Sequence, residues 1–171
     1  MKSVKYTPFA RSKGALFYFI DILYICVCGT KLSINPIIFS KGGTIIDYGT
    51  VITRLPPAAY NSLSKTFQKQ MAKYPKVLVL SILDMCYDLS NYNYTTVMIP
   101  NISFLFGGNM KVDLAPLGVL YAQSHSQICL AFAGNNKASD VGIFRNIQQR
   151  GLQVVYDVAR GKLGFGSSGC A

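Results

Sequence analysis

Short apolar runs alternate with polar turns along most of the chain, and this pattern predicts a β-rich fold. The runs are rich in Val, Ile, Phe and Tyr, whose branched and aromatic side chains suit the pleated surface of a sheet. Gly107 and Gly108 separate two of the longest runs, and a turn at 159–161 joins the last two as a closing hairpin. The expected strands cover residues 44–46, 51–52, 97–106, 112–122, 153–157 and 163–165, with a further strand at Cys129 and a short strand and turn in 31–40.

One segment has the spacing of a helix instead. Ala59, Leu63, Phe67 and Met71 recur every fourth residue, which places them on one face of a helix over 58–73. Two prolines precede this segment, and proline is tolerated in a first helical turn because the N–H that it lacks has no partner there. The Tyr-Pro pair at 74–75 is expected to end the helix.

Residues 15–29 form a nearly continuous apolar run after a basic start, so a signal peptide is one interpretation. The run is shorter than the roughly twenty residues that a membrane-spanning helix needs, and Asp21 interrupts it. Its abundance of Phe, Tyr, Ile and Val favours a pair of internal strands. We therefore expect no membrane association and no clear signal peptide in this segment.

A length of 171 residues, half of them hydrophobic, is typical of one globular domain with a real core. The net charge of +10 would favour a polyanionic partner, because all seven acids are Asp and face seventeen Lys and Arg. The basic residues are scattered, however, and their densest group repeats at roughly helical spacing, as on a solvated helix face (Lys65, Lys69, Lys73 and Lys76). We do not expect nucleic-acid binding.

Metal and cofactor chemistry have little support. The chain has five cysteines without a Cys-x-x-Cys pair, and its single histidine, His125, cannot anchor a zinc site alone. A Gly-rich phosphate loop is missing, and so is a Ser-His-Asp arrangement. We expect no metal and no cofactor.

The most informative stretch delivers a single carboxylate into a tight turn. The apolar run 44–46 ends at Asp47, Gly49 follows two residues later, and Thr50 lies three residues beyond the acid. Glycine lets backbone N–H groups approach the carboxylate, and the threonine hydroxyl can donate to it. Alone, Asp-x-Gly-Thr is also the composition of an ordinary turn.

Together with its surroundings, this block resembles the second catalytic motif of the pepsin-type aspartic endopeptidases, in the plant nepenthesin-like branch. There the pattern reads Ile-Ile-Asp-Ser-Gly-Thr and leads into Thr-x-Leu-Pro-x-x-x-Tyr, here 53–60. The likeness continues in order through Leu83-Asp-Met-Cys-Tyr87, Ile99-Pro-Asn-Ile-Ser-Phe104, Cys129-Leu-Ala-Phe132, Ile143-Phe-x-Asn-x-Gln-Gln149, Val154-Val-Tyr-Asp157 and 158–165. The resemblance implies a mainly β fold, a single pepsin-like lobe of antiparallel sheets with one or two short helices. Residues 1–14 would be a remnant of the connection between lobes, and 15–171 the C-terminal lobe.

The resemblance also implies aspartic proteolysis of peptide or protein substrates, which requires two carboxylates about 3 Å apart that share a proton. Each lobe supplies one, here Asp47 supported by Gly49 and Thr50, and no Asp-Thr-Gly-Ser of the first lobe occurs in these residues. We expect the chain to be inactive alone and to pair with a missing N-terminal lobe or with itself through its cleft face. The alternative is a non-catalytic module similar to the plant xylanase inhibitors, or a degenerate pseudoenzyme.

Two residues depart from the family pattern. Tyr48 replaces the Ser or Thr whose hydroxyl bonds across to the opposite lobe, and the longer phenol cannot reproduce that short bond. Arg145 replaces a glycine at a close crossing of two backbone segments, where a Cβ and a long cation threaten the local fold.

The resemblance pairs Cys86 with Cys129 in a disulfide and matches Cys170 to a cysteine that bonds outside the lobe. Cys26 and Cys28 stand where relatives have small residues, so we expect both in the core. A disulfide suits an oxidising compartment, and the family is secretory, extracellular or vacuolar. Asn93 and Asn101 each begin a glycosylation sequon, and Asn101 is the less favoured because it lies at a strand edge.

Overall fold

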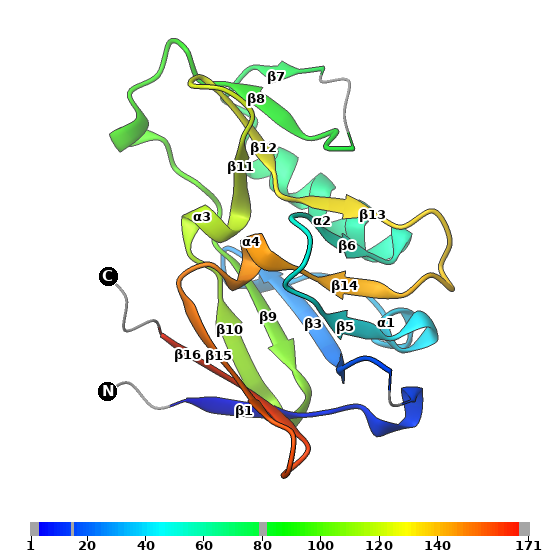
Figure 1. Ribbon diagram of the computed structural model, residues 1–171. Helices are drawn as coiled ribbons and strands as arrows, with labels where there is room; N and C mark the ends of the chain where they lie inside the picture. Colours follow the sequence, from blue (N-terminus) through cyan, green and yellow to red (C-terminus); the bar gives the residue numbers. More distant parts are fainter. Residues whose placement is uncertain (1–3, 15, 79–81, 168–171) are drawn as a thin grey trace.

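The apolar runs form short strands that assemble into four small sheets, seen in the computed structural model, which describes residues 4–14, 16–78 and 82–167 (Figure 1). The terminal sheet has the order β1-β16-β15, so it pairs the first described strand with the last. The central sheet has the order β10-β9-β3-β4, and the distal sheet β11-β12-β8-β7. The motif sheet, with the order β13-β6-β14-β5-β2, carries the Asp-x-Gly-Thr sequence.

The strand bounds are as follows, sheet by sheet. The terminal sheet holds β1 (Lys5–Pro8), β15 (Leu152–Asp157) and β16 (Lys162–Ser167); the central sheet holds β3 (Ile22–Val27), β4 (Thr30–Lys31), β9 (Ile102–Phe106) and β10 (Met110–Asp113). The distal sheet holds β7 (Lys76–Val77), β8 (Cys86–Asp88), β11 (Leu120–Ala122) and β12 (Gln127–Leu130); the motif sheet holds β2 (Phe19–Ile20), β5 (Thr44–Ile46), β6 (Thr53–Leu55), β13 (Phe132–Gly134) and β14 (Gly142–Phe144).

The described residues also contain α1 (Ile37–Gly42), α2 (Pro57–Gln70), α3 (Pro116–Val119), α4 (Asn146–Gln149) and the 3-10 turns η1 (Arg11–Lys13), η2 (Tyr94–Thr96) and η3 (Gly107–Asn109). The mainly β class and the closing hairpin β15–β16 are confirmed. Most pairings are antiparallel, but the motif sheet contains two parallel pairs, β5 with β14 and β6 with β13.

The predicted helix is confirmed as α2, which packs its periodic face against β13, β6 and β3. Leu63, Phe67 and Met71 are fully buried on this face. The helix begins directly at the second proline, and the N–H of Met71 closes its last turn on the carbonyl of Phe67. The four lysines expected on a solvated face, at 65, 69, 73 and 76, are exposed.

A cluster of phenylalanine rings joins the sheets in the core. Phe104 and Phe106 from β9 lie beside Phe132 from β13, Phe144 from β14 and Phe165 from β16, with ring centroids 5.4 to 6.2 Å apart. Offset and edge-to-face contacts at these separations are favourable beyond simple burial. The cluster therefore fixes the end of β14 against the terminal and central sheets. This end lies next to residues 47–50, which we call the Asp47 turn.

Several sequence-based predictions of local structure are wrong. Residues 51–52 are a bend, and the strand begins at Thr53. The segment 31–40 holds the start of α1 rather than only a strand and turn, and 112–122 is broken into β10, α3 and β11. Pro116 explains this break, because proline removes a ladder N–H and fits the first turn of a helix.

The apolar run 15–29 contributes two strands, as expected, but they belong to different sheets, β2 to the motif sheet and β3 to the central sheet. Asp21 separates them. In the ranges that the structure describes, none of the helices has the length and apolar character needed to cross a membrane.

Candidate active site

Asp47 stands at the exit of β5, where the chain leaves the motif sheet. Its backbone N–H donates to the carbonyl of Phe144 at 3.1 Å, which extends the parallel β5–β14 pairing by one bond. Ile46 just before it is buried, whereas Asp47 itself is partly buried. The acid is thus held where a rigid sheet meets solvent.

The carboxylate is held by its own turn. The N–H of Gly49 donates to Oδ1 at 3.0 Å, and the hydroxyl of Thr50 donates to Oδ2 at 3.4 Å. A Cβ at position 49 would lie 3.3 Å from Oδ1, a closer approach than most Cβ atoms make, so glycine leaves room for the N–H to reach the oxygen. The arrangement orients one carboxylate as an acceptor toward a water or a hydroxyl.

Helix α4 holds this turn through hydrogen bonds to its carbonyl groups. The N–H groups of Asn146 and Ile147 donate to the carbonyls of Thr50 and Val51, both at 3.3 Å. The side chain of Asn146 also reaches the carbonyl of Tyr48 at 3.5 Å. Residues 48–51 are therefore held by α4 through two backbone N–H groups and the side chain of Asn146.

Gln149 is a site residue that sequence reasoning did not single out. Its side chain is buried, and its Nε2 donates to the carbonyl of Asp47 at 3.0 Å and to that of Phe144 at 3.2 Å. Its Oε1 has no partner among the described residues. The available signal is its place at the end of the segment 143–149, which follows the family pattern.

The neighbouring glutamine makes a second buried junction. The amide of Gln148 donates to the carbonyls of Gly118 at 2.9 Å and Ala131 at 3.0 Å, while its Oε1 accepts from the hydroxyl of Thr53. The same hydroxyl accepts from the N–H of Arg145 at 2.9 Å. Buried polar groups that are this well satisfied hold the motif sheet, α3 and α4 in one register.

Arg145 leaves the local fold in place. Its φ of −108° and ψ of −175° are extended values that any residue adopts, and its N–H bonds to Thr53. The predicted threat to the backbone crossing is therefore not seen. The arginine lowers the stability of the fold in another way, because its buried Nε has no hydrogen-bond partner among the described residues.

Tyr48 is largely exposed to solvent. Its side chain is 68% exposed, so the phenol displaces nothing inside the turn. Two more tyrosines lie near the acid. The ring of Tyr156 is 5.2 Å from that of Tyr18, and burial raises the pKa of Tyr156, with a further rise from the negative charge of Asp47 and from Tyr18.

A disulfide joins Cys86 in β8 to Cys129 in β12, the pairing that the resemblance implied. It lies in the distal sheet rather than at Asp47. Cys26 is free and buried, as expected, but the prediction for Cys28 is wrong, because this free thiol is exposed in the β3–β4 turn. Cys170 lies outside the described residues.

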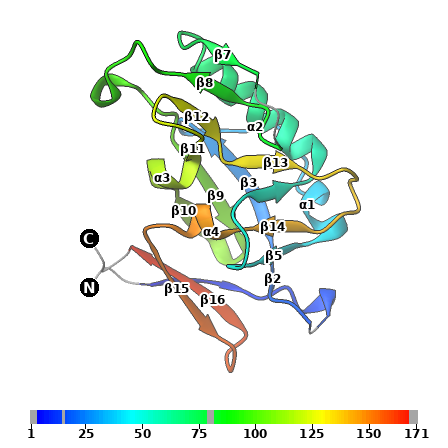
Figure 2. The ribbon, with the colours of Figure 1, turned by 45° about the horizontal axis from the view of Figure 1, so that its top comes forward.

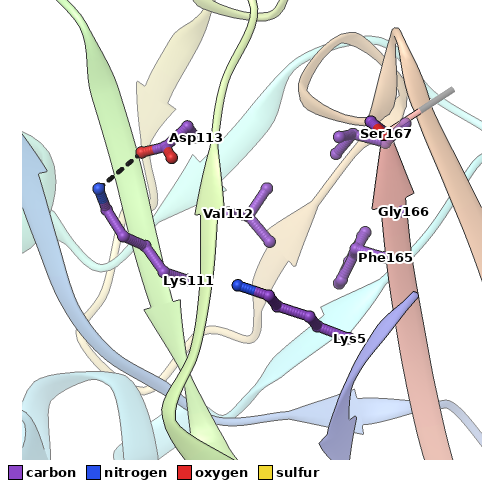
Figure 3. A pocket seen from close by; sticks show the side chains of 8 residues that line it. Lys5, Lys111, Val112, Asp113, Phe165, Gly166 and Ser167 are labelled. Atoms are coloured by element: carbon purple, nitrogen blue, oxygen red, sulfur yellow. Dashed lines mark ion pairs between the residues drawn. The ribbon is translucent and has the colours of Figure 1, made fainter. Parts of the chain in front are cut away.

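A depression of about 700 Å³ opens between the terminal and central sheets (Figure 3). Lys5, Val112 and Phe165 line it, and Lys111 at its rim is paired with Asp113 at 2.9 Å. None of its lining residues belongs to the Asp47 turn or to α4. In the part of the chain that the structure describes, no three His, Cys, Asp or Glu side chains gather as metal ligands.

Comparison with known proteins agrees with this geometry. The family described as "Xylanase inhibitor C-terminal" matches residues 17–167. An aspartyl protease family protein of Arabidopsis thaliana is 48% identical over 171 residues, which cover 99% of this chain and 36% of that protein. Aspartic proteinase nepenthesin-2 of Nepenthes gracilis is 33% identical over 164 residues, which cover 93% of this chain and 37% of that protein.

The crystal structure of edgp has the same fold, with a TM-score of 0.85 at 18% identity, and the match covers 96% of this chain and 45% of that one. The chain thus spans little more than a third of the length of the curated relatives that it matches, as expected for one lobe. It belongs to the xylanase inhibitor C-terminal family and is related over its whole length to the plant aspartyl proteases.

Proposed function

We propose that this chain is the C-terminal lobe of an aspartic endopeptidase and that Asp47 is its catalytic carboxylate. The observation that carries the proposal is the Asp47 turn, in which Gly49 and Thr50 donate to the two carboxylate oxygens. Peptide hydrolysis needs a second carboxylate close by, so that the pair shares one proton and supplies both a base and an acid. No second carboxylate is hydrogen-bonded to Asp47 within the described residues.

We propose that the second carboxylate comes from an N-terminal lobe, which would cover the face around Asp47. Large apolar side chains are exposed in this turn, at Tyr48, and just after it, at Val51, and others are exposed near it, at Tyr18 and Tyr156. Such a patch is typical of a surface that meets another protein surface. If a second copy of the chain covers it instead, the isolated chain will dimerise, and sedimentation over a range of concentrations will show it.

The test is a reconstituted two-lobe protein. The chain is fused behind the N-terminal lobe of the 48% identical Arabidopsis relative, and cleavage of a protein substrate is followed at acid pH. We expect turnover that falls by about 10²–10⁴-fold in Asp47→Asn, the usual contribution of a positioned acid–base group. Asp113→Asn, an exposed acid on β10, is the matched control. Undiminished cleavage by Asp47→Asn refutes the proposal.

A second candidate function is a non-catalytic binding module. Tyr48 favours it, because its exposed phenol stands where an active lobe carries a short hydroxyl, and so does Arg145 with its unpaired buried Nε. The family is itself named for xylanase inhibitors. Tyr48→Ser with Arg145→Gly in the two-lobe protein separates the two functions. Turnover that appears only in this variant means a damaged enzyme, whereas tight stoichiometric binding of a xylanase without turnover means an inhibitor.

A further inference from the structure

The loop between β8 and β9 presents one of the two sequons to solvent. Asn93, Tyr94 and Thr95 are all exposed, and η2 follows directly after the asparagine. In both ribbon views the loop projects from the distal sheet on the side away from α1 (Figures 1 and 2). A bulky group attached there would meet no core element and would leave the Asp47 turn open.

The side chains of this sequon already contact one another. The Oδ1 of Asn93 accepts from the N–H of Thr95 at 3.0 Å and from its hydroxyl at 2.8 Å. Both bonds use the carbonyl end of the carboxamide, so the Nδ2 end has no hydrogen-bond partner among the described residues. The atom that would carry a sugar is free and faces solvent.

The second sequon is built differently. Its hydroxyl residue, Ser103, is only 8% exposed and lies within β9, paired with Cys26 of β3 on one side and with Asp113 of β10 on the other. The carbonyl of Asn101 accepts from the N–H of Cys28 at 2.8 Å. This sequon reaches a turn conformation only if the centre of the central sheet opens.

The disulfide gives independent evidence about the compartment. The Cys86–Cys129 bond closes a loop that contains both sequons. Disulfides persist in the oxidising lumen of the secretory pathway, where asparagine sequons are modified, and they are rare in the cytosol. A chain that forms this disulfide in the secretory lumen is also exposed there, at Asn93, to an oligosaccharide transferase.

We propose that Asn93 is an N-glycosylation site of this chain and that Asn101 stays unmodified. In the transfer, Nδ2 of Asn93 forms a bond to the anomeric carbon of a lipid-linked oligosaccharide diphosphate. The bond from that carbon to the phosphate oxygen breaks, the lipid diphosphate leaves, and the amide nitrogen loses one proton. The glycan would adjoin Tyr94, the next residue along the loop, which is 56% exposed, and would shield its ring from other molecules.

The experiment expresses the whole chain behind a cleavable secretion leader in plant cells. Secreted protein that contains the Cys86–Cys129 disulfide is treated with a peptide N-glycosidase in heavy-oxygen water, and its peptides are mapped by mass. We expect the isotope label at position 93 and none at position 101. An unlabelled Asn93 in disulfide-bonded protein overturns the proposal, and a label at Asn101 overturns the argument from strand burial.

Matched variants make the same test on a gel. The mobility shift caused by the glycosidase should vanish in Asn93→Gln and in Thr95→Ala, and it should persist in Thr95→Ser and Asn101→Gln. Asn93→Asp keeps the Oδ1 acceptor of the turn and loses only the amide nitrogen, so it separates loss of the glycan from loss of the fold. A shift that survives in Asn93→Asp would place the sugar elsewhere.

Discussion

The Cys86–Cys129 disulfide should be one of the largest single contributions to the stability of the isolated lobe. The two cysteines are 43 residues apart in sequence, and both side chains are fully buried. On the chain-entropy model, closing a loop of this length in the unfolded chain is worth about 4 kcal/mol. A domain of this size has a total unfolding free energy of only about 5–15 kcal/mol, so reduction should remove a large fraction of it.

The assay is equilibrium unfolding in urea with and without a reductant. The chain lacks Trp but has eleven Tyr, so far-UV circular dichroism and tyrosine fluorescence are the appropriate probes. With a urea slope of about 2 kcal/mol/M, a loss of about 4 kcal/mol lowers the unfolding midpoint by about 2 M.

The variant Cys86→Ala/Cys129→Ala is the control that separates loop closure from packing. It lacks the cross-link in both conditions, so a reductant should leave its unfolding midpoint unchanged. It should also be less stable than the reduced parent by about 1 kcal/mol for each buried sulfur that it removes. A parent protein whose unfolding free energy falls by less than about 1 kcal/mol on reduction would refute the loop-closure argument, for which the expected value is about four times larger.

Three further predictions test the core and the Asp47 region. Phe144→Ala removes a fully buried ring from the aromatic cluster and should lower the unfolding free energy by about 3–5 kcal/mol in urea unfolding. Leu117→Ala, at a residue that is 71% exposed, is the control and should change it by less than about 0.5 kcal/mol. Thr53→Val leaves the N–H of Arg145 without its acceptor and the Oε1 of Gln148 without its donor, so it should lower the unfolding free energy by about 2–3 kcal/mol in the same assay. Thr53→Ser keeps the hydroxyl and should keep most of the stability. Asp47→Asn should lower the pKa of Tyr156, because the carboxylate disfavours the phenolate, and carbon-13 NMR titration of the tyrosine rings measures it. An unchanged Tyr156 pKa in Asp47→Asn would contradict the proximity of the two groups. Since the folded state raises this pKa, the contribution of Tyr156 to stability is complete below the ordinary tyrosine pKa and is lost as the pH rises through the folded value.

The elements with a strong local signal could be predicted from the sequence. Helix α2 has an apolar face at a clear helical period and two prolines at its start, so its existence could be predicted, although the expected range of 58–73 starts one residue late and ends three residues late. The β15–β16 hairpin was likewise marked by two apolar runs around a glycine turn. In these cases the local preferences and the tertiary packing agree.

The failures occurred where tertiary contacts or special turns decide the structure. The turn from β3 to β4 gives both Cys28 and Gly29 a positive φ, 49° and 78°, as a two-residue hairpin of type I′ requires. Cysteine is an unusual residue at such a position, so the apolar run did not indicate that the turn begins before Gly29. Helix α1 is only six residues long and has no side-chain cap, so its period could not be recognised.

The candidate site was predictable in its centre but not in its support. Asp47, Gly49 and Thr50 follow from the motif, because their interactions are local in sequence. Gln149 lies 102 residues from Asp47, and its contact is to a backbone carbonyl that any residue would offer. Such a contact leaves no complementary side chain to find, so only the folded chain reveals it.

Tyr48 and Arg145 affect the lobe and its function separately. The Asp47 turn is held by two backbone N–H groups of α4 and by the side chains of Asn146 and Gln149, so its shape does not depend on the side chain of Tyr48. Arg145 supports Thr53 through its backbone N–H alone. Replacing it by glycine removes an unpaired buried Nε, worth about 1–3 kcal/mol, against a backbone-entropy cost of about 0.5–1 kcal/mol. Reverting both residues should therefore leave the urea midpoint of the lobe unchanged or higher, while only a two-lobe protein registers the change in activity. A lobe that is clearly destabilised by the reversion would mean that Tyr48 and Arg145 have become part of its own packing.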